Sequence, residues 1–142
     1  MSEAAVITRG TVNGATSPAG SVLIVDDEAE IRESLQTLLE IEGFQVETAA
    51  TGEEGLSQMA DQPFDLVLLD LTLPGRDGME ILSEIRAHDG RMPVIMITAY
   101  GDEETRRRAL AAGAAGLFTK PIDFPELRGE IGRVLEAASS LQ

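Results

Sequence analysis

The stretch VLIVDDEAE, residues 22–30, runs from four apolar residues directly into Asp26, Asp27 and Glu28. An entirely apolar strand is typical of a parallel sheet whose two faces are both covered by helices. Two carboxylates about 4 Å apart repel each other by about 4 kcal/mol at an effective dielectric constant of about 20, so acids gathered at a strand end need a cation or a proton. The stretch therefore predicts an α/β domain with an acidic site at the end of its first strand.

The composition fits one acidic domain. A chain of 142 residues with 43% hydrophobic content is long enough for one core and too short for two ordinary domains. Its formal net charge of -14 repels nucleic acid phosphates and anionic membrane surfaces, so we expect no direct binding to either. The chain has no cysteine, and His88 is its single histidine. Any bound metal should therefore be a hard ion with oxygen ligands.

The sequence also suggests where the protein is found and where its domain begins. The longest apolar runs are of strand length, and the first twenty residues lack the basic start and apolar block of a secretory signal, so we expect a cytoplasmic protein. Residues 1–19 mix small, polar, Gly and Pro residues without a period, which predicts a flexible N-terminal leader. We place the folded domain at residues 20–142.

Short apolar runs alternate with segments of helical period. We read three of the five runs as fully apolar, which predicts strands buried on both faces, whereas the run FQVETA alternates apolar and polar residues and is typical of an edge strand. The strand candidates are residues 22–25, 44–49, 64–69, 93–98 and 116–119.

Five helices are expected after these strands. The first shows apolar Ile31, Leu35, Leu38 and Leu39 at helical spacing and should end at Gly43. The other helices are indicated by an N-cap, a neighbouring glycine or an apolar face. The residues concerned are Thr51 with Glu54 as a capping box, Gly78 followed by Met79, Leu82 and Ile85, Asp102 with Gly113, and Asp123 followed by Phe124, Leu127, Ile131, Val134 and Leu135.

Five strand-helix units with right-handed crossovers are too few for an eight-stranded barrel. They predict an open, doubly wound sheet of five parallel strands with five helices, whose site lies at the carboxyl ends of the strands. Asp26 and Asp27 end the first strand, Asp70 the third, Thr98 the fourth and Lys120 the fifth.

These strand-end residues have the chemistry of phosphoryl transfer. Carboxylates without nearby His or Cys favour Mg²⁺ or Mn²⁺. Asp70 would attack phosphorus as the nucleophile and form an acyl phosphate. The metal and Lys120 would neutralise the phosphoryl oxygens, while the Thr98 hydroxyl would donate a hydrogen bond to one of them.

Four segments then reveal a family resemblance. LIVDDE, DLVLLDLTLPGRDGME, PVIMITAYGD and AGAAGLFTKPID stand in the order and spacing of receiver domains of two-component response regulators, and the resemblance covers about residues 21–138. It implies a flavodoxin-like fold similar to that of chemotaxis regulators. The roles it implies are Asp26 and Asp27 as Mg²⁺ ligands, Asp70 as phospho-acceptor and metal ligand, the Thr72 backbone carbonyl as a further ligand, Thr98 and Lys120 as phosphate-binding groups, a cis Lys120–Pro121 bond, and Pro74 and Gly78 as shapers of the loop after Asp70.

One position departs from the family pattern. Receiver domains usually carry an aromatic residue three positions before the lysine, but Leu117 stands there. Phe118 is adjacent, yet strand alternation should direct it to the opposite face of the sheet. Tyr100, two residues after Thr98, is the better candidate to replace the missing ring, so we count Thr98, Tyr100 and Leu117 as switch residues.

The resemblance implies a signalling switch and not a turnover enzyme. Asp70 would receive a phosphoryl group from a histidine kinase or histidine phosphotransfer protein, and the protein would catalyse only its own phosphorylation and dephosphorylation. Phosphorylation would draw Thr98 inward and change the surface of the fourth helix, fifth strand and fifth helix, which binds an unknown downstream protein.

Several alternatives stay open. The chain could be a single-domain regulator, which we favour, or a receiver excised from a longer one. A phosphatase of the haloacid dehalogenase type would need a second Asp where Thr72 stands. A flavodoxin-like flavin protein is disfavoured because the acids after the first strand would repel the flavin phosphate.

The only basic run is Arg106, Arg107 and Arg108. Because Glu103 and Glu104 precede it, we interpret it as a solvated helix face with ion pairs between neighbouring turns. The alternative is a docking surface for an acidic partner.

Overall fold

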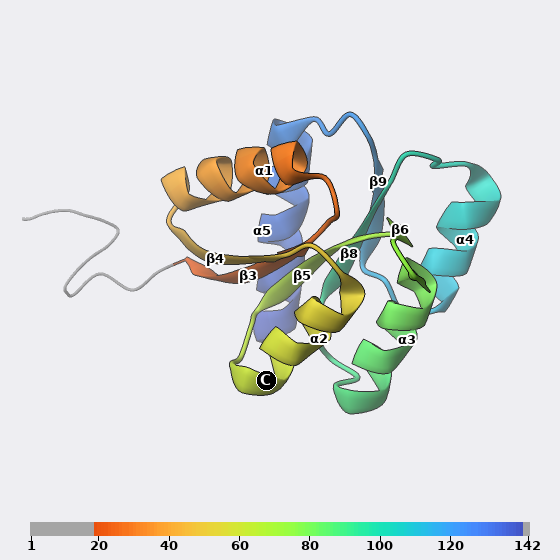
Figure 1. The fold of residues 1–142 in the computed structure, drawn as a ribbon. Coiled ribbons are helices and arrows are strands. Elements are labelled where there is room, and N and C mark those ends of the chain that lie inside the picture. The colour runs from red at the N-terminus through yellow and green to blue at the C-terminus, as the bar shows by residue number, and fades with distance from the viewer. Residues whose placement is uncertain (1–18, 141–142) are drawn as a thin grey trace, which may run out of the picture.

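The computed structural model describes residues 19–140, which form one parallel five-stranded sheet with helices on both faces (Figure 1). The strand order is β4-β3-β5-β8-β9. This confirms the predicted open, doubly wound fold. The strands are β3 (Gly20–Val25), β4 (Phe44–Ala49), β5 (Leu66–Asp70), β8 (Val94–Thr98) and β9 (Gly116–Thr119). Residues 1–18 lie outside the described part, so the leader stays a prediction.

Five helices form the two outer layers. α1 (Ala29–Ile41) and α5 (Phe124–Ser140) pack on one face of the sheet, and α2 (Gly52–Asp61), α3 (Gly78–His88) and α4 (Glu103–Ala111) cover the other (Figure 1). The inner strands β3, β5 and β8 therefore have both faces covered, which explains their apolar composition. β4 is an edge strand, as its alternating sequence predicted.

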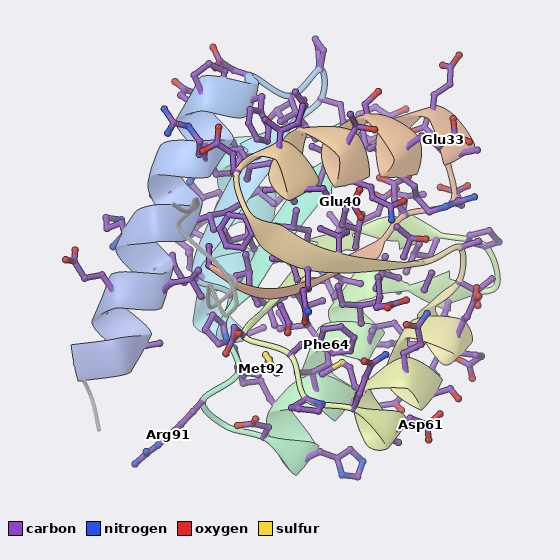
Figure 2. All side chains as sticks on the ribbon, turned by 90° about the vertical axis from the view of Figure 1, so that its left-hand side faces the viewer. Glu33, Glu40, Asp61, Phe64, Arg91 and Met92 are labelled. Carbon is purple, nitrogen blue, oxygen red and sulfur yellow. The ribbon has the colours of Figure 1, made fainter. Side chains whose placement is uncertain are left out.

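Two apolar clusters, one on each face of the sheet, form the core. Alternation along β3 sends Leu23 and Val25 to the α2-α3-α4 side, and Val22 and Ile24 to the α1-α5 side. Phe64 and Met92 lie at the amino ends of β5 and β8, where Arg91 extends away from the molecule (Figure 2). These apolar side chains occupy the amino edge of the sheet, and the polar site lies at the opposite edge, where the strands have their carboxyl ends.

Helix ends follow the sequence signals closely. Gly43 has a positive φ of 99° just after α1, a conformation that glycine adopts without strain. The Thr51 side chain accepts a hydrogen bond from the Glu54 amide at 3.1 Å, and Asp102 accepts one from the Thr105 amide at 2.8 Å. The capping box differs in one bond, because the Glu54 side chain accepts from the amide of Ala50 instead of Thr51.

Three details of the sequence prediction were wrong or incomplete. Leu38 is 37% exposed, since it lies about 60° around the helix from buried Leu35, at the border of the apolar stripe. On α3, Ile81 is buried while Met79 is only half-buried. The small hairpin of β6 (Thr72–Leu73) and β7 (Arg76–Asp77) was missed.

Arg86 joins three segments at the amino edge of the sheet. From α3 its guanidinium donates hydrogen bonds to the carbonyls of Asp89 at 3.0 Å, Met92 at 2.5 Å and Gly113 at 2.9 Å. A Cβ on Gly113 would lie 2.7 Å from Arg86 Nε and would push the Arg86 side chain away, and the positive φ of Gly113 also favours glycine. Arg86 therefore ties the end of α3 to the start of β8 and to the turn after α4.

We expect Arg86→Ala to lower the free energy of unfolding by about 2–3 kcal/mol, because three carbonyls lose a charged donor. Urea denaturation followed by circular dichroism measures this. Arg91→Ala is the matched control, since Arg91 is exposed, and it should change stability by no more than about 0.5 kcal/mol. Equal losses for the two variants would contradict a joining role for Arg86.

Candidate functional site

The carboxyl ends of neighbouring strands bring the predicted polar residues to one edge. Asp26 and Asp27 follow β3, Asp70 ends β5, Thr98 ends β8, and Lys120 follows β9. Carboxylate oxygens of the three aspartates all lie within 4.8 Å of one another. Asp26, Asp70 and Thr98 are the buried polar residues of the described part of the chain. The predicted grouping of the three acids with the lysine is therefore what the fold produces.

Asp26 is held with one oxygen committed and the other available. Its Oδ1 accepts a hydrogen bond from the Glu28 amide at 2.8 Å, and its backbone carbonyl accepts one from Arg32 at 2.7 Å. Its buried Oδ2 accepts no hydrogen bond among the described residues, although Lys120 Nζ lies 3.1 Å away. A buried carboxylate oxygen without a donor indicates a place for a positive ligand.

Asp70, unlike Asp26, accepts hydrogen bonds with both of its carboxylate oxygens. Oδ1 accepts from the Thr72 amide at 3.0 Å, and Oδ2 accepts from Lys120 Nζ at 3.1 Å. Burial raises the pKa of Asp70 and the Asp26 charge raises it further, although the Thr72 amide and Lys120 act in the opposite direction. The environment therefore disfavours the ionised form of Asp70, and an additional cation beside the carboxylate would stabilise that form.

Lys120 carries the positive charge of the site. Its ammonium lies 3.1 Å from Asp26 Oδ2, 3.1 Å from Asp70 Oδ2 and 2.5 Å from Glu28 Oε1. Burial alone would lower the pKa of Lys120, but the three neighbouring carboxylates outweigh burial and raise it, so the lysine is a cation at neutral pH. The peptide bond between Lys120 and Pro121 is cis, as the family resemblance implied.

The donor set fits a hard divalent cation. The cluster offers carboxylate oxygens, and one of them has no hydrogen-bond donor. One lysine does not balance the charge of three aspartates and Glu28. Mg²⁺ and Mn²⁺ prefer oxygen ligands of this kind, and Asp26, Asp27 and Asp70 are the residues that would hold such an ion.

Within the described part of the chain, the Thr98 hydroxyl is bonded to its own loop and not to Asp70. Its hydroxyl accepts from the Tyr100 amide at 3.0 Å and lies 3.4 Å from the Tyr100 carbonyl oxygen. Tyr100 is 74% exposed, whereas Leu117 is buried in the α2-α3-α4 cluster. Phe118 packs on the opposite cluster, beside α1 and α5, as strand alternation predicted.

Sequence reasoning missed two contacts near the site. It gave no role to Glu28, whose pairing with Lys120 joins residues 92 positions apart in the chain. It also overlooked Gly101, where an added Cβ would lie 1.9 Å from Thr119 Oγ1. The signal that could have predicted the contact with Lys120 is the position of Glu28 directly after Asp26 and Asp27. Gly78 behaves as expected, because a Cβ there would lie 2.5 Å from the Asp70 carbonyl oxygen.

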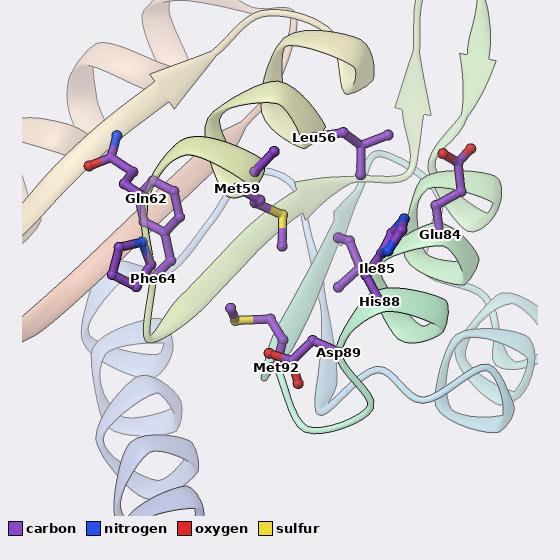
Figure 3. Close-up of a pocket in the computed structure, with 11 residues that line it drawn as sticks. Leu56, Met59, Gln62, Phe64, Glu84, Ile85, His88, Asp89 and Met92 are labelled. Atoms are coloured by element: carbon purple, nitrogen blue, oxygen red, sulfur yellow. The ribbon is translucent and has the colours of Figure 1, made fainter.

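A separate cavity of about 410 Å³ lies between α2 and α3 at the amino edge of the sheet (Figure 3). Met59 and Met92 extend into it, and Gln62 and His88 contribute polar groups. The cavity contains none of the strand-end acids. It is therefore distinct from the site formed by Asp26, Asp70 and Lys120.

The fold and the acidic edge together define a flavodoxin-like α/β domain with three aspartates and a lysine at its strand ends. The family model of the response regulator receiver domain matches residues 22–132. The chain therefore belongs to the receiver domain family of two-component response regulators. Within the described residues, no helix has the length and apolar character needed to cross a membrane.

Relatives and solved structures agree with this assignment. The chain is 41% identical to Regulatory protein AtoC of Escherichia coli over 118 residues, which is 83% of this chain and 26% of that protein. It is 39% identical to Chemotaxis protein CheY of Halobacterium salinarum, over 84% of this chain and 99% of that one. A CheY-like receiver structure from Methanospirillum hungatei aligns with a TM-score of 0.82 and 35% identity, covering 86% and 98% of the two chains.

The matched proteins differ in length. The chain spans between about a quarter and about a half of several curated relatives, and nearly all of others. Receiver domains thus occur among these relatives both as most of a protein and as one part of a longer regulator.

We expect Asp70→Asn to raise the thermal unfolding midpoint by about 2–5 °C in the presence of a chelator at neutral pH. The folded state raises the pKa of Asp70 above its unfolded value, so ionised Asp70 costs stability at neutral pH and the cost disappears as the pH falls. Differential scanning calorimetry measures the shift. Mg²⁺ should reduce the difference, because it stabilises the native protein by mass action. A lower midpoint for the variant in chelator would contradict this account.

Proposed function

We propose that this receiver domain is a phosphorylation-dependent switch in which Asp70 accepts a phosphoryl group. The observation that carries the proposal is the pairing of Asp70 Oδ2 with Lys120 Nζ at 3.1 Å, beside an Asp26 oxygen that has no donor. The donor would be a phosphohistidine on a histidine kinase or a phosphotransfer protein. The downstream partner is a protein of unknown identity, and the cytoplasmic location remains a prediction.

The chemistry we propose is an in-line displacement. An Asp70 oxygen attacks the phosphorus, the bond between phosphorus and the histidine nitrogen breaks, and the imidazole leaves with a proton from solvent. An acyl phosphate on Asp70 results, and attack by water later returns the carboxylate and inorganic phosphate. A bound Mg²⁺ would neutralise phosphoryl oxygens during both steps.

Lys120 and Thr98 would bind the phosphoryl oxygens. Lys120 already lies beside Asp70, and its raised pKa keeps it charged. The Thr98 hydroxyl must give up its hydrogen bond from the Tyr100 amide before it can turn toward a phosphoryl group. Movement of Thr98 would therefore release the loop between β8 and α4.

Two contacts would pass this movement to the surface formed by α4, β9 and α5. Gly101 packs against Thr119 on β9, and Arg106 of α4 donates a hydrogen bond to the Leu117 carbonyl at 3.2 Å. Arg106 is thus more than part of a solvated face. In this proposal exposed Tyr100 responds to Thr98 in place of the family aromatic, because Leu117 is fixed in the core.

The protein should gain one phosphoryl group on incubation with acetyl phosphate and Mg²⁺, and Asp70→Asn should gain none. Intact mass spectrometry measures the difference. Asp61→Asn, on exposed surface at the end of α2, is the matched control and should behave like the native protein. Phosphorylation of the Asp70→Asn variant would overturn the proposal. So would a native protein that gains no phosphoryl group from either acetyl phosphate or a histidine kinase.

Phosphorylation should shift amide resonances of residues 98–106 and 116–120, because Thr98 leaves the Tyr100 amide. Thr98→Ala should reduce these shifts by more than half, whereas Thr98→Ser should keep them because it retains the hydroxyl. Two-dimensional NMR with and without the phosphoryl group provides the measurement. Equal shifts in the native protein and the Ala variant would show that Thr98 does not carry the change.

A further inference from the structure

Glu28 is the acidic residue at this edge for which the proposed chemistry has no use. Its carboxylate lies 2.5 Å from Lys120 Nζ, closer than either Asp26 or Asp70 at 3.1 Å. Lys120 Nζ donates hydrogen bonds to Glu28 and Asp70, and Asp26 Oδ2 lies beside it as an ion-pair partner, so three carboxylates surround one ammonium. A phosphoryl oxygen that binds Lys120 therefore competes with these carboxylates for the ammonium.

The exposure of the three carboxylates indicates which one leaves. The side chains of Asp26 and Asp70 are 1% and 4% exposed, whereas that of Glu28 is 56% exposed. A buried carboxylate that loses its cation is left without water, while Glu28 returns directly to solvent. Asp70 is also the residue that carries the phosphoryl group, so it stays in place.

The Glu28 side chain has no other structural task among the described residues. Glu28 is the N-cap residue of α1, but its side chain accepts no hydrogen bond from the helix amides. It is the backbone amide of Glu28 that donates to Asp26 Oδ1. A change of the side chain at this position should therefore leave the anchoring of Asp26 intact.

We propose that the Glu28 carboxylate competes with the phosphoryl group for Lys120, and so weakens binding of the phosphoryl group at Asp70. This inference rests on the proposed function of the same site. Glu28 acts through Lys120 and is a positioning residue, because it touches neither phosphorus nor Asp70 in the contacts described. The negative charge of Glu28 also repels the phosphoryl dianion, and this repulsion further weakens binding of the phosphoryl group.

The test measures affinity for trifluoroberyllate, a mimic of the phosphoryl group, at saturating Mg²⁺ in the full chain. Glu28→Gln should bind the mimic about two- to fivefold more tightly than the native protein, the range of a partly exposed ion pair. After phosphorylation by acetyl phosphate, the Glu28→Gln variant should lose its phosphoryl group more slowly than the native protein by a similar factor. Isothermal titration calorimetry and intact mass provide the two readouts.

Glu30→Gln is the matched control. Glu30 is exposed in the first turn of α1 and makes no ion pair with the described residues, so the variant removes the same charge from the same helix without touching Lys120. It should leave the affinity within about 1.5-fold of native. The gain in Glu28→Gln should shrink as salt rises from about 0.05 M to about 1 M, since the pair is partly exposed to solvent.

The outcomes separate this inference from the proposed function. If the native protein binds the mimic but Glu28→Gln binds it equally or more weakly, the competition is overturned and the switch chemistry stands. An equal gain in Glu30→Gln would also overturn it, since overall charge would then be the cause. A native protein that neither binds the mimic nor gains a phosphoryl group would overturn the proposed function itself. Tighter binding of the mimic by Glu28→Gln cannot be ascribed to a damaged fold, because damage to the fold would weaken binding.

Discussion

The carboxyl edge of the sheet depends on one ammonium group placed among several carboxylates. Lys120 lies 3.1 Å from Asp26 and Asp70, two side chains that the fold buries at the carboxyl ends of adjacent strands β3 and β5. Without a cation, their repulsion would oppose the pairing of these strands at this end. The strand order makes the neutralisation possible, because β9 runs parallel to β8 and delivers Lys120 just beyond the Thr98 carbonyl.

The neutralisation is incomplete, and this gives the domain its chemistry. A fully balanced cluster would have no affinity for another cation, whereas this one keeps an Asp26 oxygen without a donor. The same edge holds Thr98, whose hydroxyl is bonded to its own loop and not to the acids. The site therefore has an excess of negative charge on one side and, on the other, a hydroxyl that is not bonded to the acids. Both features are compatible with the proposed binding of a metal ion and a phosphoryl group at this edge.

Most of the fold could be read from the sequence because its strands are buried on both faces. Runs such as residues 22–25 and 94–97 are apolar without interruption, and the acids or hydroxyl that follow them stand out. The opposite faces of Leu117 and Phe118 followed from strand alternation alone. The small hairpin at residues 72–77 could not be found, since strands of two residues carry no period.

The contacts that were missed depend on side-chain geometry between distant segments. Glu28 and Lys120 are 92 positions apart, and their pairing requires the exact reach of both side chains at the finished sheet edge. Gly101 and Thr119 touch because a loop folds over a neighbouring strand, which no local pattern encodes. Arg86 likewise reaches carbonyls of two different loops. Sequence patterns place elements well, but they do not show which side chains meet once the elements pack.

The exposed ring of Tyr100 has a practical consequence. The chain contains one tyrosine and no tryptophan, so its near-ultraviolet emission on excitation above the phenylalanine band comes from this single ring. Tyr100 is 74% exposed and its amide is bonded to the Thr98 hydroxyl at the centre of the acidic edge. The native protein thus carries an intrinsic fluorophore on the loop between β8 and α4, and its conformational state can be followed in real time without a label.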